Sequence, residues 1–486
     1  MSKNSSSTAI STNRLRSERP SSDDFKQYMS SNWGDVLPVG LENNPETQFA
    51  AARRAKLSEK FQGDRLIIEA GNLKRRANDT DYRFRPFTEF AYFTGLGADY
   101  EPGAVLVFEP VKVKLPQGKL RTHICTLYID PMKDRTSEEF YTSASHGEFW
   151  VGKRPDLKTF ASKTGLETAP LEQLKADLKK PLPPWSKTRM LTEEGGDAKL
   201  VEFASELRLV KDSFEVGEIE KAIKATREGF ERVIRSLPDA TGKARSERIV
   251  EGEFLANALH KGNNVGYDTI VASGEHATTL HWIRNNGTLK KGELLLLDAG
   301  VEVESLYTAD ITRTLPISAS FSEVQRTVYD IVLEAADAAF GVVKPGARFY
   351  DVHNAAMEVI AKRLIDLNII KDATLEEVLS ENGGQHRRWM VHGTSHHLGL
   401  DVHDCAHARA SEYFEGTLKE GMVFTIEPGL YFKSEDKLVP EKYRGIGVRI
   451  EDNILVTEDG AKNLSKSIPR TANHVEAWMK RLQGLV

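Results

Sequence analysis

The chain has 486 residues, of which 40% are hydrophobic and 28% are charged, and its net charge is -5. This length exceeds what one ordinary core supports and suits two domains and a tail. The acidic balance argues against a nucleic-acid binder, which usually carries a basic face, and the lack of an 18-residue apolar run argues against a membrane span.

The chain has only two cysteines, Cys125 and Cys405. They are too few for a disulfide framework or a cysteine-rich zinc site, which favours a reducing compartment, and a cytoplasmic location is expected. The N-terminus has no apolar signal core. Its serines and arginines resemble a mitochondrial transit peptide in composition, but Asp23 and Asp24 follow closely, so a disordered or partner-binding tail is favoured.

The first half of the chain is predicted to hold a polar tail, residues 1–40, and one α/β domain, residues 41–195. A charged helix is predicted over 47–61, a strand over 65–69, and a turn leading into a buried strand over 101–108. Strands mixed with helices are expected to continue to about residue 185, where prolines 181, 183 and 184 indicate a break.

The second half, residues 196–486, is predicted to form a larger α+β domain. Apolar residues at helical spacing predict buried helix faces over 219–237, 324–339 and 352–360. Short apolar strands are predicted over 294–297 and 423–426, between and after these helices.

This half contains an internal similarity. Residues 289–300 read LKKGELLLLDAG and residues 418–429 read LKEGMVFTIEPG, which places Asp298 opposite Glu427. Two ordinary strands with ordinary turns are one explanation. A duplicated half-domain that brings two strand-end carboxylates to one centre is favoured, because burying a lone charge is costly. Pro428 and Gly429 are expected to end the second strand.

Asp310, Arg449 and Glu451 extend the set of candidate site residues. Taken alone, an aspartate after a strand is more often a turn or cap residue, and Arg449 with Glu451 is more often a surface ion pair. On a strand, however, positions 449 and 451 share a face that Ile450 does not. Carboxylates that are buried together need cations, because like charges in close contact cannot all stay ionised.

Histidines are concentrated near these motifs, since six of the thirteen lie between His386 and His407. His392, His396 and His403 are spaced by four and seven residues, amid glycines that permit close approach. A lone histidine is more often structural, but this density is typical of metal ligation or proton handling near neutral pH.

The stretch 392–404, together with the two aspartate and two glutamate motifs in this order, resembles the aminopeptidase P and prolidase branch of the methionine-aminopeptidase-like metallopeptidases. The resemblance covers residues 200–475, and residues 89–96 resemble part of the family's N-terminal domain more weakly. It implies a C-terminal pita-bread domain, a smaller α/β N-terminal domain, and assembly into a homodimer or homotetramer.

The resemblance also implies a site for two divalent metal ions. Asp298 would bind one ion, Asp310 and Glu451 would bridge both, and the second ion would also be bound by His396 and Glu427. Four carboxylates and one imidazole suit manganese better than an ion that prefers thiolates, with zinc, cobalt and iron as alternatives. The spacing of Asp298 and Asp310 is one residue longer than expected, which affects the expected loop geometry more than the ligation.

Around these ligands, the resemblance implies outer positions for His281, His392 and His403, and it places Arg449 behind the bridging ligands. Hydrolysis by a water activated between the two ions is expected, with Glu427 moving the proton to the leaving nitrogen and His403 polarising the carbonyl. His392 and His281 are expected to position the prolyl side of the substrate.

The expected activity is therefore removal of an N-terminal residue from peptides with proline at the second position. Proline selectivity rests on the resemblance alone. A prolidase, which shares the ligands but takes only dipeptides, is the alternative. A non-catalytic binding protein of this fold and a metal-free amidinohydrolase-like relative are disfavoured, because all five ligand positions are intact.

Overall fold

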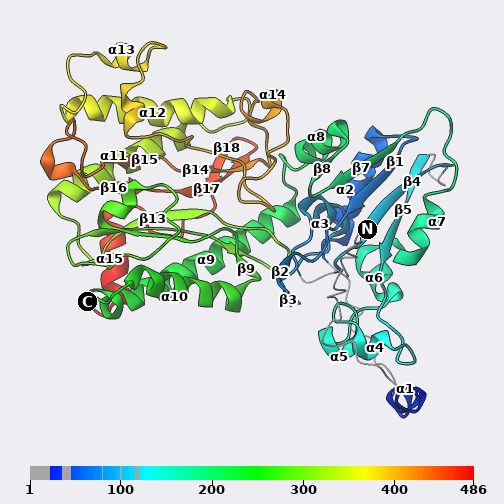
Figure 1. Cartoon of the computed structure of the whole chain (residues 1–486). Coiled ribbons are helices and arrows are strands. Elements are labelled where there is room, and N and C mark those ends of the chain that lie inside the picture. Colours follow the sequence, from blue (N-terminus) through cyan, green and yellow to red (C-terminus); the bar gives the residue numbers. More distant parts are fainter. Residues whose placement is uncertain (1–21, 35–44, 79, 99–100, 115–119, 486) are drawn as a thin grey trace, which may run out of the picture. The chain divides into compact units, whose positions relative to one another are not determined.

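The computed structural model describes residues 22–34, 45–78, 80–98, 101–114 and 120–485 (Figure 1). The chain divides into two compact units, Met1–Leu200 and Val201–Val486. Most of the predicted tail lies outside the described residues, apart from a short stretch that includes helix α1 (Asp23–Ser30). Cys125 and Cys405 are both free thiols. Within the described residues, no helix combines the length and apolarity that crossing a bilayer requires.

The first unit is built on a six-stranded mixed sheet with the order β6-β5-β4-β1-β7-β8. The neighbours β1–β4, β4–β5 and β7–β8 are antiparallel, whereas β1–β7 and β5–β6 are parallel. The strands of this sheet are β1 (Arg65–Glu69), β4 (Val105–Lys114), β5 (Leu120–Ile129), β6 (Glu167–Pro170), β7 (Thr188–Thr192) and β8 (Gly195–Gly196). A separate two-stranded ribbon pairs β2 (Arg75–Ala77) with β3 (Thr80–Asp81).

Helices accompany this sheet, and the predicted helix over 47–61 and strand over 65–69 are confirmed as α2 and β1. Part of the core forms where Ile67, Val105, Val107 and Tyr128 pack together, with partly buried apolar residues from 169–178 against them. The helices are α2 (Thr47–Lys60), α3 (Thr88–Thr94), α4 (Glu139–Thr142), α5 (Glu148–Val151), α6 (Leu157–Thr164) and α7 (Leu174–Asp177).

The predicted break near residue 185 is present, because residues 181–187 form neither helix nor strand, but strands of the same sheet follow it. Strand β7 follows the prolines and pairs in parallel with β1, from Arg65 opposite Thr188 to Ile68 opposite Leu191. The prolines therefore mark a connection that leads back into the sheet, which is the usual place for residues that cannot donate to a strand ladder.

The second unit places short strands between two helix pairs. In Figure 1 the pair α11 and α12 lies on one side of these strands and the pair α9 and α10 on the other. All three predicted apolar helix faces fall within α9, α11 and α12. The helices are α8 (Ala198–Leu207), which begins in the first unit, α9 (Ser213–Ala240), α10 (Ser246–Lys261), α11 (Glu323–Gly341), α12 (Phe349–Asp366), α13 (Leu375–Leu379), α14 (Ala410–Tyr413) and α15 (Ala472–Leu482).

Helix α9 illustrates why the sequence folds in this way. Asp212 caps its N-terminus by accepting from the backbone of Phe214 and Glu215, and the Glu215 side chain returns the bond to the Asp212 backbone. The apolar positions predicted from helical spacing, between Ile219 and Leu237, are buried. Such a reciprocal cap fixes where the helix starts, and its apolar stripe fixes which face packs inward.

The strands of the second unit form two three-stranded sheets, β10-β11-β13 and β14-β17-β18, and two ribbons, β12-β9 and β15-β16. Backbone bonds also join these groups, because the amide of Glu451 donates to the carbonyl oxygen of Thr312 over 3.1 Å. The strands are β9 (Asn264–Val265), β10 (Ile270–Ser273), β11 (Leu294–Ala299), β12 (Val301–Glu302), β13 (Ile311–Pro316), β14 (Val423–Ile426), β15 (Gly429–Tyr431), β16 (Gly447–Arg449), β17 (Asp452–Thr457) and β18 (Gly460–Asn463).

The predicted end of the second strand at Pro428 and Gly429 is confirmed, and a further strand follows directly after it. Strand β14 ends at Ile426, but β15 begins at Gly429 and pairs with β16. Glu427 therefore lies between two strands, and its backbone pairs in neither the β14–β17 nor the β15–β16 ladder.

Candidate metal centre

Four carboxylates stand at or beside strand ends in the second unit. Asp298 lies in β11, opposite Thr312 of β13, and Asp310 directly precedes β13. Glu427 follows β14, and Glu451 precedes β17. Asp298, Asp310 and Glu451 are buried, and Glu427 is half-buried.

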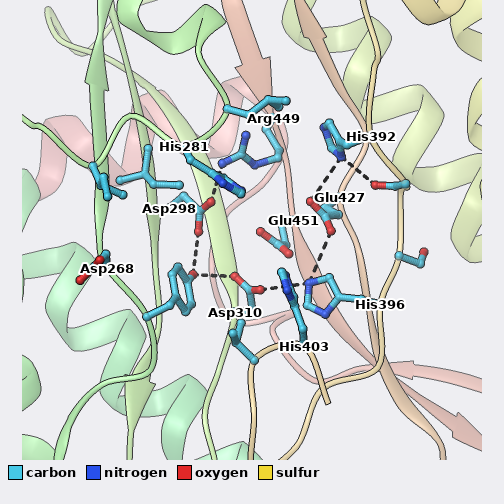
Figure 2. A pocket seen from close by; sticks show the side chains of 17 residues that line it. Asp268, His281, Asp298, Asp310, His392, His396, His403, Glu427, Arg449 and Glu451 are labelled. Carbon is cyan, nitrogen blue, oxygen red and sulfur yellow. Dashed lines mark hydrogen bonds and ion pairs between the residues drawn. The ribbon is translucent and has the colours of Figure 1, made fainter. Parts of the chain in front are cut away.

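His396 joins two of these carboxylates. Its Nε2 lies 3.2 Å from Oδ2 of Asp310 and 3.5 Å from Oε1 of Glu427, and the His403 ring packs edge-on with a centroid distance of 4.4 Å. Figure 2 shows the carboxylates and these imidazoles around one shared space. The structure brings every predicted site residue to the same cavity, of about 570 Å³, lined by Asp298, Asp310, Glu427, Glu451, His281, His392, His396, His403 and Arg449.

The residues in this cavity fit a bound cation. Ligand atoms of Asp310, His396 and Glu451 all lie within 4.8 Å of one another. Among the described residues, Oε1 of Glu451 is buried with no hydrogen-bond partner, although buried polar atoms are rarely left unsatisfied. Carboxylate oxygens with one imidazole are ligands that suit divalent ions such as Mn²⁺ and Zn²⁺.

The pKa values of the cavity side chains also favour a bound cation. Burial raises the pKa values of Asp298 and Glu451, and it raises the pKa of Glu427 to about 7. Burial also disfavours the charged form of His396, but the hydrogen bond to Asp310 and the charge of Glu427 outweigh it and raise the His396 pKa to about 9. Divalent cations would compensate these carboxylates, and their binding would displace protons.

The histidine-rich segment owes its orientation to β14. The Thr425 amide donates to the His396 carbonyl over 2.9 Å, and the Glu427 amide donates to the Thr394 carbonyl over 2.8 Å. Side chains alternate along such an extended segment, so His396 faces the cavity while His397 points away. His397 is fully buried and stacks on Phe349 with a centroid distance of 4.8 Å, which is a packing role.

A buried ion pair anchors the end of this segment. Asp404 and Lys211 are both inaccessible to solvent, and the Lys211 ammonium lies 3.0 Å from Oδ2 of Asp404. Arg208 also lies 3.5 Å from Oδ1 of Asp404, so this carboxylate is held by two cations one residue beyond His403.

Arg449 connects the carboxylates to one another. Its Nη2 contacts Oδ2 of Asp298, and its Nε donates to the Thr312 hydroxyl over 3.0 Å. The Thr312 hydroxyl donates in turn to Oε2 of Glu451 over 2.7 Å. Nη1 of Arg449 donates to the Tyr431 hydroxyl over 3.1 Å. One guanidinium thus orients the Asp298 carboxylate directly and the Glu451 carboxylate through the Thr312 hydroxyl.

Three residues that contribute to the site were not predicted from the sequence: Thr312, Tyr431 and Tyr267. Thr312 stands two residues after Asp310 and so shares its strand face, a signal that was present but not used. Tyr431 lies close after Glu427, and its hydroxyl is 2.8 Å from Nε2 of His392. Tyr267 has no local signature, because its role depends on residues more than thirty positions away.

Tyr267 touches both aspartates, so its removal is expected to weaken metal binding. Its hydroxyl lies 2.6 Å from Oδ1 of Asp298 and 2.5 Å from Oδ1 of Asp310, and it carries a single proton to donate. We expect Tyr267→Phe to lower the affinity for Mn²⁺ by about 10- to 100-fold, because partners of the ligands orient them. Isothermal titration calorimetry of the chelator-stripped protein measures this affinity.

Tyr329→Phe is the matched control for this change. It removes a buried tyrosine hydroxyl that donates to the Arg470 carbonyl over 2.7 Å, outside the cavity. The control is expected to keep the Mn²⁺ affinity of the unmodified protein. Equal affinities for Tyr267→Phe and the unmodified protein would show that Tyr267 does not orient the ligands.

Comparison with known proteins places this site in a family. Residues 217–458, which contain all the predicted site residues, match metallopeptidase family M24, and residues 50–188 match the aminopeptidase P N-terminal domain. Xaa-Pro aminopeptidase 1 from Streptomyces coelicolor is 46% identical over 95% of this chain and 93% of its own length. The chain belongs to the aminopeptidase P group of metallopeptidase family M24.

More distant members of the family agree with this assignment. Xaa-Pro aminopeptidase from Escherichia coli is 30% identical over 89% of this chain and 97% of its own length. The solved structure of zinc-substituted E. coli aminopeptidase P in complex with product superimposes with a TM-score of 0.73, at 28% identity, over 92% of this chain and 99% of that one. The predicted fold, a pita-bread domain with a smaller N-terminal domain, is confirmed.

Proposed function

We propose that this protein is a metal-dependent aminopeptidase that hydrolyses the bond between an N-terminal residue and a following proline. The observation that carries this proposal is the gathering of four carboxylates and His396 around one cavity, in a chain 46% identical to an Xaa-Pro aminopeptidase over nearly its whole length. The substrates are peptides with proline at the second position.

Five residues would hold two divalent ions: Asp298, Asp310, His396, Glu427 and Glu451. Bound divalent ions supply a water of lowered pKa and a Lewis acid for the scissile carbonyl. Manganese is our choice of ion, because the set is rich in carboxylate oxygen and contains no thiolate. Arg449 orients the ligands through its ion pair with Asp298 and its hydrogen bond to Thr312.

Glu427 is proposed to carry the proton from the attacking water to the leaving prolyl nitrogen. It is the half-buried member of the carboxylates and stands in the break between β14 and β15. Its Oε1 lies 3.5 Å from Nε2 of His396, and its Oε2 lies 3.7 Å from Nδ1 of His392. A general acid–base group must lie within hydrogen-bond reach of the proton that it transfers, and the place of Glu427 in the cavity suits that role.

The remaining histidines are proposed to act on the substrate. His403, packed against His396, would donate a hydrogen bond to the oxygen of the scissile carbonyl as negative charge develops there. His392 and His281 would position the prolyl side. The Tyr431 hydroxyl, shared between His392 and Arg449, holds the His392 ring in place.

The test is a comparison of substrates with and without metal. The protein is stripped with a chelator, supplied again with Mn²⁺, and assayed on Xaa-Pro-Yaa tripeptides, Xaa-Pro dipeptides and proline-free tripeptides. We expect release of the first residue from Xaa-Pro-Yaa only when Mn²⁺ is present, and no release from the proline-free peptides. Cleavage of dipeptides alone would indicate a prolidase, and bound metal without any cleavage would indicate a binding protein.

Several finer expectations belong to the same proposal. We propose that the two ions are manganese, that the protein is cytoplasmic, and that it assembles as a homodimer or homotetramer without nucleic-acid or membrane partners. Metal analysis of the purified protein, cell fractionation and light scattering test these points separately. The proposed domain limits are a tail over 1–40, an N-terminal domain over 41–195 and a catalytic domain over 196–486.

A further inference from the structure

The placement of His281 depends on the loop that carries it. His281 lies on the connection between β10 and β11 and lines the cavity together with Leu280 and Ile283. Its side chain is exposed and, within the described residues, forms no hydrogen bond. The backbone of the loop therefore sets which part of the cavity the imidazole can reach.

A carboxylate outside the cavity binds this loop on both sides of His281. Glu247, on α10, is fully buried. Its Oε1 accepts from the amide and hydroxyl of Ser273, over 2.9 and 2.7 Å, and lies 2.9 Å from Nδ1 of His276. Its Oε2 accepts from the indole N–H of Trp282 over 2.9 Å and from the Gly287 amide over 2.6 Å.

Three of these contacts hold the loop on either side of His281, and the two to Ser273 hold the end of β10 from which the loop starts. Trp282 is the next residue in the chain, so fixing its indole fixes the backbone at position 281 as well. The Trp282 ring also stacks on His276, with centroids 3.9 Å apart. Further along, Asn285 ties the loop to β10 by accepting from the Val271 amide over 3.0 Å.

The chemistry of Glu247 suits a positioning role. The donors hold the pKa of Glu247 below its usual value, although burial alone would raise it, so the side chain is a carboxylate at neutral pH. An ionised carboxylate accepts hydrogen bonds and donates none, and each of the five contacts uses that property.

We propose that Glu247 is a positioning residue. It holds the loop so that the His281 imidazole extends into the cavity, where it orients the prolyl side of the substrate. This inference rests on the proposed function. Glu247 touches neither the carboxylates of the metal centre nor the cavity. Its effect on turnover is therefore transmitted through the loop.

Glu247→Gln tests the proposal, because a glutamine amide nitrogen would face donors whichever way it turned. We expect the kcat/KM for Xaa-Pro-Yaa to fall about 10- to 100-fold, since a small misplacement of a positioning group is enough for such a loss. Bound manganese, measured by elemental analysis, is expected to stay at the level of the unmodified protein.

A double-mutant cycle with His281→Ala separates positioning from general damage. If Glu247 acts through His281, adding Glu247→Gln to His281→Ala causes no further loss in kcat/KM beyond about twofold. Losses that multiply would overturn the proposal, and so would a fall in bound manganese that parallels the fall in activity.

Two further variants complete the experiment. Trp282→Phe removes one donor while keeping an aromatic ring against His276, and it replaces Glu247→Gln in the cycle if that variant does not fold. Gly252→Ala, on the same helix with open space around the added methyl, is the matched control and is expected to leave kcat/KM unchanged. An unmodified protein that fails to cleave Xaa-Pro-Yaa would contradict the proposed function and not this inference.

Discussion

Asp310→Ala is expected to abolish metal-dependent turnover while leaving the fold intact. Asp310 contributes a ligand atom to the group within 4.8 Å and contacts both His396 and Tyr267. Bound ions supply several kcal/mol of stabilisation to the transition state, so their loss is expected to lower kcat/KM by more than about 10³-fold. Peptide assays, elemental analysis and circular dichroism on the same preparation measure turnover, bound metal and fold.

Asp268→Ala provides the matched control for metal content. Asp268 lines the same cavity, but Figure 2 shows it apart from the group of carboxylates. Its removal is expected to leave the bound manganese unchanged, whereas Asp310→Ala loses it. Asp310→Ala protein that retained metal and normal turnover would refute the assigned centre.

His403→Ala is expected to reduce the rate far more than it reduces metal content. We assign His403 to the substrate carbonyl and not to an ion, so the loss is that of one hydrogen-bond donor to developing charge, about 10²- to 10³-fold in kcat. The measurement pairs steady-state kinetics on Xaa-Pro-Yaa with elemental analysis.

His407→Ala is the matched histidine control. His407 lies in the same histidine-rich region but is exposed and does not line the cavity. Its replacement is expected to change neither kcat nor metal content. Loss of metal in His403→Ala would mean that His403 is a metal ligand and that its assignment to the substrate carbonyl is wrong.

Much of the second unit could be predicted because its signals are local. The buried stripe from Ile219 to Leu237 and the reciprocal cap at Asp212 both lie within one helix. The short strands predicted at 294–297 and 423–426 are confirmed as parts of β11 and β14, since the first is a continuous apolar run and the second is interrupted only by Thr425.

The course of the chain after a predicted break could not be read from the sequence. The prolines near residue 185 locally indicate a break, but only pairing with β1 decides that β7 rejoins the sheet. Pro428 and Gly429 end β14 as predicted, but only pairing with β16 decides that a new strand starts at Gly429. A local breaker signal cannot report a partner strand that is distant in the sequence.

The sequence by itself determined which chemical groups are available, namely the ordered carboxylates Asp298, Asp310, Glu427 and Glu451 and the dense histidines. It also carried the resemblance to a metallopeptidase family, which the comparisons identify as M24. Only the tertiary structure decided how those groups are held. Thr312 reaches Glu451 across 139 positions, and Tyr267 reaches Asp310 across 43. Hydrogen bonds between such distant residues leave no periodicity or spacing in the chain, because the packing of helices and sheets, and not the local sequence, brings the partners together.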